Sequence, residues 1–126
     1  MENEFEFGSI VEKACEALYN KKAEDIKILE IRKYLPQIAD FFVLATANSA
    51  EHMNALRRHL EEELANEKIT LHHVEGTRSG ARWVLLDYNE VIIHIMLREA
   101  REFYRLEELW NDVPRWSYHE TFERED

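Results

Sequence analysis

One short run, residues 40–47 ("DFFVLATA"), constrains the fold more than any other part of the chain. The run is nearly all apolar and partly aromatic or β-branched. Because successive side chains of a strand point to opposite faces, such a run is typical of an inner strand that is covered on both sides. The chain therefore has to supply covering elements for both faces of a sheet.

The first half of the chain supplies two helices and a further strand. Ser9 and Glu12 predict a capping box at the start of a helix over residues 9–23, and residues 25–31 ("DIKILEI") alternate like a half-buried strand. Asn48 or Ser49 caps a second helix over residues 48–68. The apolar side chains on one side of that helix are Met53, Leu56, Leu60 and Leu64.

The second half predicts three strands and a short helical segment. Residues 69–76 form a strand that ends at Gly76, and residues 81–88 and 90–96 form a hairpin whose turn includes Asn89. Residues 98–110 form one or two short helices. We expect an α/β (mixed α+β) fold with about five strands in a mixed sheet covered by helices, as one domain over residues 1–116. Residues 117–126 are predicted to be a polar, acidic and frayed C-terminal tail.

Charge limits the kinds of partner that the chain can hold. The sequence has 26 acidic and 16 basic residues, a net charge of −10, and no dense cluster of lysine and arginine. A protein that binds nucleic acid through its phosphates normally presents a basic face, so direct nucleic-acid binding is not expected. A basic partner protein would be attracted to this chain.

Three features of the sequence indicate a cytoplasmic protein without membrane association. No apolar run approaches the roughly 20 residues that cross a bilayer, and the acidic N-terminus "MENEFEFGS" lacks the features of a secretion signal. Cys15 is the single cysteine, so it can form no internal disulfide. Its helical spacing from Val11 and Leu18 predicts a buried side chain.

Residues that suggest chemistry have simpler explanations. His72 and His73, with Glu75 and His94 nearby, are poorly arranged as metal ligands, because neighbouring strand residues point to opposite faces. Ser49 next to His52 suggests a nucleophile and base, yet a helix cap accounts for the serine. We therefore predict no catalytic residue, metal site or cofactor.

The more serious enzyme hypothesis is a nucleotidyltransferase. Residues 44–53 ("LATANSAEHM") have the strand-loop-helix outline of that superfamily's phosphate-binding segment. Its chemistry requires carboxylates that converge on magnesium, and this segment offers only Glu51. Asp87 and Glu90 flank a hairpin turn, and exposure to solvent at the turn is sufficient to explain why acidic residues stand there. The fold can be of this kind while the catalysis is missing.

Four co-linear segments resemble one family. "ADFFVLATANSAEHMNAL", "HHVEG", "WVLLDYNEVIIHIM" and "REFYRLEELW" are similar in order and spacing to the ribosomal silencing factor family, also called the Iojap family, over roughly residues 9–112. Ala47 and Asn89 stand where relatives usually have glycine. Ala47 makes phosphate binding by this segment less favourable, because its Cβ blocks a close approach of the backbone. Asn89 tolerates the same turn as glycine.

The resemblance implies a nucleotidyltransferase-like fold without that activity. It also implies binding to the large ribosomal subunit through the ribosomal protein numbered fourteen. The bound factor would block joining of the small subunit and repress translation under nutrient limitation, and organelle relatives act in large-subunit biogenesis. An active nucleotidyltransferase and a self-associating domain, a homodimer formed through the hairpin edge, are the alternatives.

The partner surface is predicted around the strand that starts at Trp83. Alternation places Trp83, Leu85 and Asp87 on one face, where the tryptophan would be an anchor beside an acidic rim; a core position for Trp83 is the alternative. The partner-binding candidates are Glu75, Trp83, Leu85, Asp87, Tyr88 and His94.

The segment "REFYRLEELW" is expected to be mainly structural. Helical spacing predicts that Ala100, Phe103, Leu106 and either Leu109 or Trp110 pack against the sheet. Tyr104 and Trp110 are the residues that could instead be exposed anchors.

Overall fold

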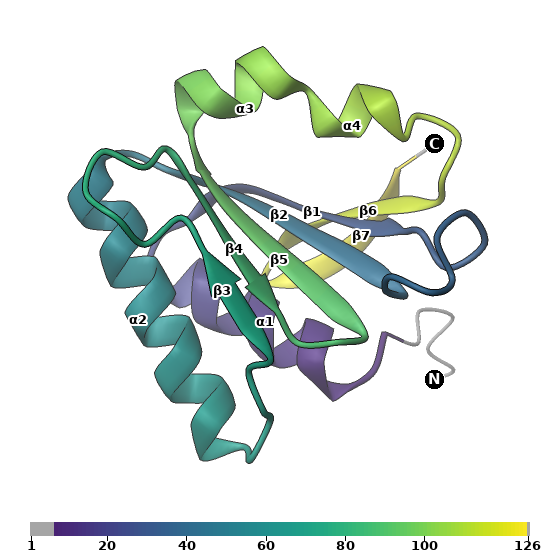
Figure 1. Cartoon of the computed structure of the whole chain (residues 1–126). Coiled ribbons are helices and arrows are strands. Elements are labelled where there is room, and N and C mark those ends of the chain that lie inside the picture. The colour runs from purple at the N-terminus through teal and green to yellow at the C-terminus, as the bar shows by residue number, and fades with distance from the viewer. Residues whose placement is uncertain (1–6, 126) are drawn as a thin grey trace.

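The structure, a computed structural model, describes residues 7–125. Seven strands form one mixed sheet in the order β3-β4-β5-β2-β1-β6-β7. Helices lie on both of its faces, with α1 and α2 on one side and α3 and α4 on the other (Figure 1). The predicted α/β class is confirmed, with seven strands in place of about five.

Two buried parallel strands form the centre of the sheet. β2 (Phe41–Ala47) pairs with β5 (Val91–Leu97) in parallel, whereas all other neighbouring strands pair antiparallel. Every residue of β2 is buried, and so is every residue of β5 except Leu97. The prediction of an inner strand over residues 40–47 is therefore confirmed.

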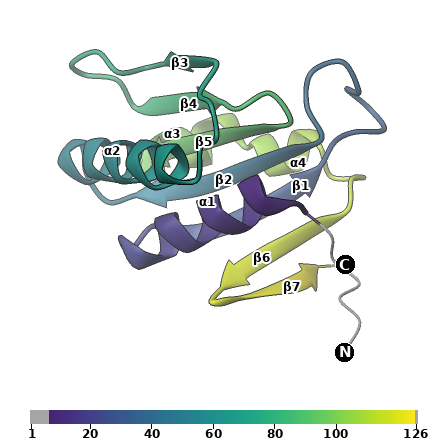
Figure 2. The same ribbon diagram turned by 90° about the horizontal axis from the view of Figure 1, so that it is seen from below.

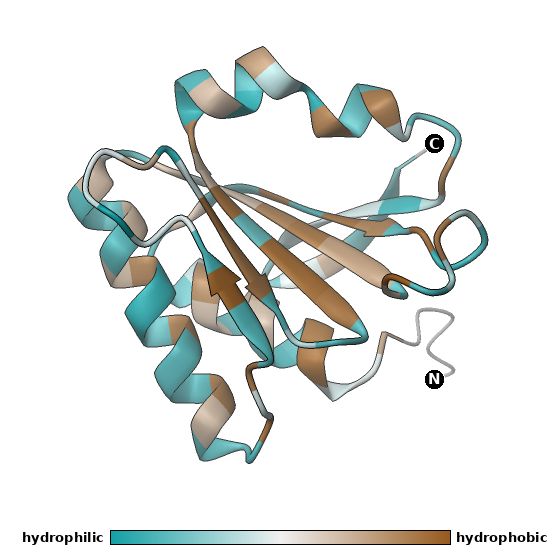
Figure 3. Ribbon diagram, in the orientation of Figure 1, coloured by the Kyte–Doolittle hydropathy of each residue, from teal (hydrophilic) through white to brown (hydrophobic). Residues whose placement is uncertain are grey.

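α1 (Ser9–Asn20) and α2 (Ala50–Asn66) pack side by side on one face of the sheet (Figure 2). The predicted apolar side of α2 is confirmed. Cys15 of α1 is buried as predicted. Its burial, and to a smaller extent the charge of Glu12, raises the pKa of the Cys15 thiol. Hydrophobic residues are concentrated in the central strands (Figure 3), and they form the core together with the buried residues of α1 and α2.

Of the two predicted helix caps, the one of α2 is confirmed and the one of α1 is not. Ser49 caps α2, because its Oγ accepts the backbone N–H of His52 at 3.0 Å. The capping box at Ser9 is wrong, because Ser9 is already the first helical residue and makes no side-chain cap bond. Gly8, whose φ of 87° suits glycine, holds the N-cap position instead.

β3 (His73–Glu75) is shorter than predicted, whereas the hairpin of β4 (Trp83–Asp87) and β5 is confirmed. Asn89 has the expected positive φ, 78°. The residues before His73 still follow the end of α2, where the N–H of Ile69 donates to the carbonyl of Leu64 at 2.9 Å. The predicted strand over residues 69–76 is therefore correct only in its last part.

The other face of the sheet is covered by α3 (Arg98–Tyr104), α4 (Leu106–Leu109) and residues 31–40. Ala100 is buried, and Leu106 and Trp110 pack partly buried against this core. Of the two alternatives Leu109 and Trp110, it is therefore Trp110 that packs, whereas Leu109 is 70% exposed. The packing predicted for Phe103 is wrong, because this side chain is 78% exposed.

Within α3 the buried residues are Ala100 and Arg101, so Phe103 lies off the buried side. A break in the helix then changes the spacing beyond Tyr104. Arg105 has left-handed φ and ψ of 50° and 55°, and it ends α3 and precedes α4. A single helical spacing therefore cannot run from Ala100 to Trp110, since the break rotates the second part relative to the first.

The predicted frayed tail is also wrong. β6 (Arg115–His119) pairs with β1 (Glu24–Glu30), and β7 (Thr121–Glu125) pairs with β6. Trp116 and Tyr118 are buried in the core beside α1, and Phe122 packs partly buried against it. These aromatic residues alternate with polar ones, so a period of two is hidden in a segment that is polar on average.

Replacing Trp116 by alanine tests whether the C-terminal hairpin belongs to the folded core. We expect the free energy of unfolding to fall by about 3–5 kcal/mol, since a buried aromatic side chain is removed. Glu123→Ala, at an exposed position of β7, should change it by about 0.5 kcal/mol or less. Chemical denaturation measures both, and equal stabilities of the two variants would contradict the packing of the hairpin.

Candidate partner-binding surface

The outward face of β4 carries the residues that sequence alternation selected. Trp83, Leu85 and Asp87 are partly exposed, whereas Val84 and Leu86 are fully buried on the side of α2. The predicted alternation is confirmed.

The sheet register brings further candidates to the same face. Glu75 of β3 lies opposite Leu85, and Leu85 lies opposite His94 of β5. Directly opposed residues of antiparallel strands share a face, so these three form one row across three strands. Glu75 is exposed, and its Oε2 lies 2.8 Å from Nε2 of His73, within hydrogen-bond distance.

Trp83 is fixed by a hydrogen bond to the strand beneath it. Its indole N–H donates to Nδ1 of His94 at 3.0 Å, and the two rings lie 5.7 Å apart between centroids. Trp83 is only partly buried, so it is neither a core residue nor a freely rotating surface one. The bond holds the indole in a single orientation with one part of it exposed.

His94 is a support for this surface, since it is only 4% exposed. Burial lowers the pKa of His94 to about 4, so the ring is neutral near pH 7. Because Nδ1 accepts the bond from Trp83, the hydrogen of the neutral ring is on Nε2. The ring of Phe42 meets His94 edge to face at 4.8 Å and completes its packing.

Tyr104 extends the surface from α3. Its ring is 53% exposed and lies 4.9 Å from the ring of Trp83, and Phe103 lies 5.0 Å from Tyr104 on its other side. The sequence indicated Tyr104 as an alternative anchor, but only the fold places it against Trp83. We call Glu75, Trp83, Leu85, Asp87 and Tyr104 the Trp83 surface.

Tyr88 does not join the Trp83 surface. Its side chain is 2% exposed and lies in the core on the side of the sheet that α1 and α2 cover. Burial, followed by the charge of Glu61, raises the pKa of Tyr88 to about 12. Strand alternation explains this position, since Tyr88 follows the inward Val84 and Leu86; its selection as a partner-binding residue is withdrawn.

A shallow hollow of about 320 Å³ lies on the Trp83 surface. It is lined by Glu75, Gly76, Arg78, Trp83 and Leu85. Gly76 has a φ of 84°, and a Cβ there would meet the backbone oxygen of Trp83 at 2.0 Å. Only glycine therefore allows the chain to pass this close to the tryptophan.

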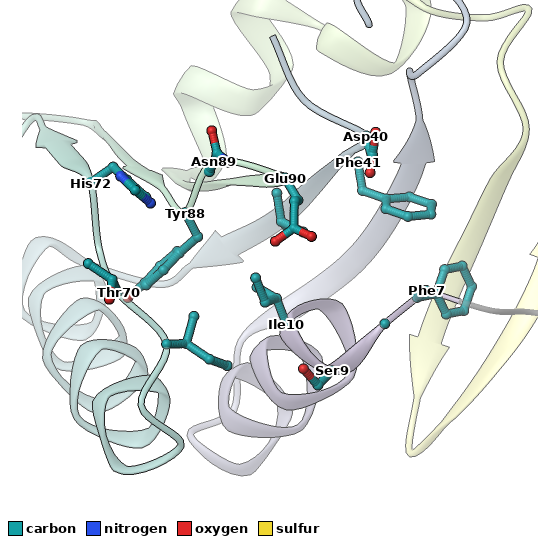
Figure 4. A pocket seen from close by; sticks show the side chains of 13 residues that line it. Phe7, Ser9, Ile10, Asp40, Phe41, Thr70, His72, Tyr88, Asn89 and Glu90 are labelled. Carbon is teal, nitrogen blue, oxygen red and sulfur yellow. The ribbon is translucent and has the colours of Figure 1, made fainter. Parts of the chain in front are cut away.

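A separate cavity of about 330 Å³ lies near the start of α1, at the turn between β4 and β5. Figure 4 shows Glu90 reaching into it above Ile10, with Tyr88 and Asp40 on its sides. The first residues of β2 and β5 line it, together with Ile69, Thr70 and His72 from the segment between α2 and β3. None of the residues of the Trp83 surface lines it.

The segment that suggested nucleotidyl transfer is engaged in local structure. Nδ1 of His52 accepts the backbone N–H of Asn48 at 2.9 Å, and its Nε2 lies 2.8 Å from the carbonyl oxygen of Lys21. Ser49 Oγ bonds the backbone of His52, so the two side chains do not form a nucleophile–base pair. Across residues 7–125, no three histidine, cysteine or acidic side chains gather as metal ligands.

Comparison with known proteins identifies the family. The family model described as "Ribosomal silencing factor during starvation" matches residues 5–126. The ribosomal silencing factor RsfS of Bacillus subtilis is 34% identical over 106 residues, which are 84% of this chain and 88% of that protein. The chain belongs to the ribosomal silencing factor family.

Other members extend the likeness to organelles and to solved structures. The chloroplastic protein Iojap of Zea mays is 33% identical over 92 residues, 73% of this chain and 39% of that protein. A crystal structure of a Chromobacterium violaceum protein has a TM-score of 0.78 and 32% identity, and covers 85% of this chain and 88% of that one. Within residues 7–125, the helices of this family member are too short or too polar to cross a membrane.

The buried His94 makes a testable contribution to the stability of this silencing-factor domain. Between about pH 6.5 and 4 the unfolded chain takes up a proton on His94 that the folded chain excludes. The free energy of unfolding should therefore fall by up to about 3 kcal/mol across this range and, for this residue, level off below it. Denaturation at several pH values measures the fall.

His94→Gln is the control for that measurement, because a glutamine oxygen can still accept the indole N–H of Trp83. The difference in stability between the original chain and this variant should shrink from pH 7 to pH 4. Parallel pH profiles of the two proteins would contradict a neutral, buried His94.

Proposed function

We propose that the chain silences ribosomes by binding the large ribosomal subunit through the Trp83 surface. Membership of the silencing factor family supports the large subunit as the partner. The observation that carries the choice of surface is the exposed pair of Trp83 and Tyr104, fixed from below by the bond to His94. Fixed aromatic side chains lose little freedom on binding and often dominate interface energies.

The partner on the subunit is proposed to be the ribosomal protein numbered fourteen, as the family resemblance implies. Glu75, beside Trp83, and Asp87, at the other end of β4, form an acidic rim on the same face. Acidic side chains at the edge of an interface steer a basic partner into place. This chain, with a net charge of −10, is suited to a basic ribosomal protein.

Silencing would result from binding of the factor to the large subunit, without a chemical step. A factor bound at the face where the subunits join prevents the small subunit from docking, and so lowers translation when nutrients are scarce in the cytoplasm. The engagement of Ser49 and His52 in the cap of α2 supports this non-enzymatic function over nucleotidyl transfer.

The geometry does not favour self-association through the β4–β5 hairpin. β4 pairs with β3 on one side and with β5 on the other, so the hairpin offers no long free edge. The edges of the sheet are β3, with three residues, and β7, with five. Short or charged edge strands are a common means of limiting pairing between chains.

Co-sedimentation with isolated large subunits tests the surface. Tyr104→Ala should weaken binding by roughly 30-fold, because an exposed hot-spot aromatic contributes about 2 kcal/mol. Tyr34→Ala is a matched control, since Tyr34 is 51% exposed and lies against Trp110 and not against Trp83. The control should bind like the original chain.

Trp83→Ala belongs to the same experiment, together with a measurement of its unfolding. The variant should bind at least as poorly as Tyr104→Ala while it remains folded. Full binding by folded Trp83→Ala and Tyr104→Ala proteins would remove the Trp83 surface from the proposal. Failure of the original chain to co-sediment would contradict the function itself.

The acidic rim predicts a salt-dependent association rate. The rate of binding to immobilised large subunits should fall between about 50 and 150 mM salt, since exposed charges are screened. Glu75→Gln with Asp87→Asn should lower the rate and flatten this dependence. Glu62→Gln with Glu63→Gln makes the same charge change at exposed positions of α2, and a similar effect of both pairs would exclude local steering by the rim.

A further inference from the structure

A second hollow borders the first one on the Trp83 surface and adds a second arginine and two aromatic side chains of α3. It has a volume of about 460 Å³ and lies between residues 76–82 and α3. Arg78 and Arg82 line it from the loop, and Phe103 and Tyr104 line it from the helix. It adjoins the hollow beside Glu75, and Gly76, Arg78 and Trp83 line both. We call it the Arg78 pocket.

The two arginines of the pocket carry charges that no acidic side chain of the described residues neutralises. Both are exposed, and neither forms an ion pair with any residue between 7 and 125. Residues 77–86 contain no acidic side chain, and Glu99 is the only carboxylate that lines the pocket. Five other arginines pair with glutamates, namely Arg32–Glu30, Arg57–Glu61, Arg98–Glu24, Arg101–Glu107 and Arg105–Glu108, whereas Arg58, Arg115 and Arg124 form no ion pair among residues 7–125. The pocket is therefore locally positive although the chain is strongly negative.

The rings in the pocket present flat apolar faces to solvent. Phe103 is 78% exposed and is the most exposed large apolar side chain in the described part of the chain. It meets Tyr104 edge to face with interplanar angle 88°, so the two rings hold each other in place. Exposed aromatic rings beside arginines are the usual platform on which unpaired bases stack while their phosphates are held.

The backbone of the loop is held before any ligand arrives. The N–H of Ala81 donates to the carbonyl of Arg78 at 3.2 Å, and the N–H of Leu97 donates to the carbonyl of Arg82 at 2.9 Å. The tight passage of Gly76 along Trp83 fixes the start of the loop. Binding therefore orders two side chains and leaves the loop backbone largely unchanged, which lowers the entropic cost.

We propose that the Arg78 pocket binds single-stranded RNA, with Arg78 and Arg82 on phosphates and a base stacked on Phe103. This rests on the proposed function in one respect, since the RNA meant is ribosomal RNA beside the protein that the Trp83 surface contacts. An acidic protein segment would satisfy the arginines and leave the exposed ring of Phe103 without a partner. RNA uses both kinds of group.

The net charge of the chain disfavours nucleic-acid binding, but the local charge of the Arg78 pocket differs from the net charge. Net charge governs the attraction felt at a distance. Contacts to a phosphate depend on charges within a few ångströms, and the screening length is about 8 Å at physiological salt. We therefore expect weak binding to free RNA that becomes useful only beside a protein contact.

Fluorescence anisotropy with a short fluorescein-labelled single-stranded RNA and the full chain tests the proposal. If the two arginines contact two phosphates, raising the salt concentration from about 50 to 200 mM should weaken RNA binding about sevenfold. Arg78→Ala with Arg82→Ala should lower affinity at low salt about tenfold and remove most of the salt dependence. Arg58→Ala with Lys68→Ala makes the same charge change at exposed positions of α2 and just beyond its end, and should bind more strongly than the pocket variant.

Phe103→Ala separates stacking from charge. It should weaken RNA binding about fivefold or more while the salt dependence stays unchanged, because a stacked base contributes roughly 1–3 kcal/mol. Polyglutamate serves as the competing ligand. If it binds more tightly than the RNA, and Phe103→Ala leaves that binding intact, the pocket is for an acidic protein segment and the proposal is overturned.

The same variants on large subunits distinguish failure of this proposal from failure of the proposed function. The arginine variant should co-sediment several-fold less well than its charge-matched control. Absence of RNA binding by the original chain, or equal behaviour of the pocket and control variants, would overturn the RNA site. The silencing function would still stand if Tyr104→Ala alone abolished co-sedimentation.

Discussion

The parallel pairing of β2 with β5 is the constraint on which the rest of the structure depends. Both strands are almost wholly apolar and must be covered on both faces, and a parallel pair cannot be joined by a tight turn. The connection runs through α2, which covers one face, and returns through β3 and β4. The other face then needs its own cover, which α3, α4 and residues 31–40 provide. Helix placement, and with it the position of the Trp83 surface, follows from this pair.

Arg101 joins the cover on that second face to the sheet. Its guanidinium, 7% exposed, donates to the carbonyl of Asp25 at 2.6 Å, to Thr46 Oγ1 at 2.9 Å and to Glu107 at 2.7 Å. Burial by itself would raise the pKa of Glu107, but the hydrogen bond and charge of Arg101 outweigh it and lower that pKa. A buried charge is tolerated only when it is paired and hydrogen-bonded in this way. The network ties α3 to α4 across the left-handed Arg105, and so sets the direction in which Phe103 and Tyr104 face.

The resulting face brings acidic and basic side chains together around one tryptophan. Glu75, Arg78 and Leu85 line the hollow on one side, and Arg82 and Phe103 line only the neighbouring pocket, which Arg78 and Trp83 share. A ribosomal surface offers basic protein and phosphate side by side, so a face with both characters can match it where a uniformly acidic face cannot. His94 serves both hollows, since it fixes the ring that lines them both.

The sequence by itself determined the inner strand, the two long helices, the β4–β5 hairpin and the outward alternation of Trp83, Leu85 and Asp87. These features are periodic over a few residues, and hydrophobic period is a local property that the chain carries without its fold. The four co-linear motifs likewise identified the family. Tertiary structure alone placed His94 beside Trp83, set Tyr104 against it, left Phe103 exposed on α3 and added β6 and β7 to the sheet beside β1. A local pattern shows which side of a segment is apolar, but which distant segment covers that side depends on packing across the whole chain.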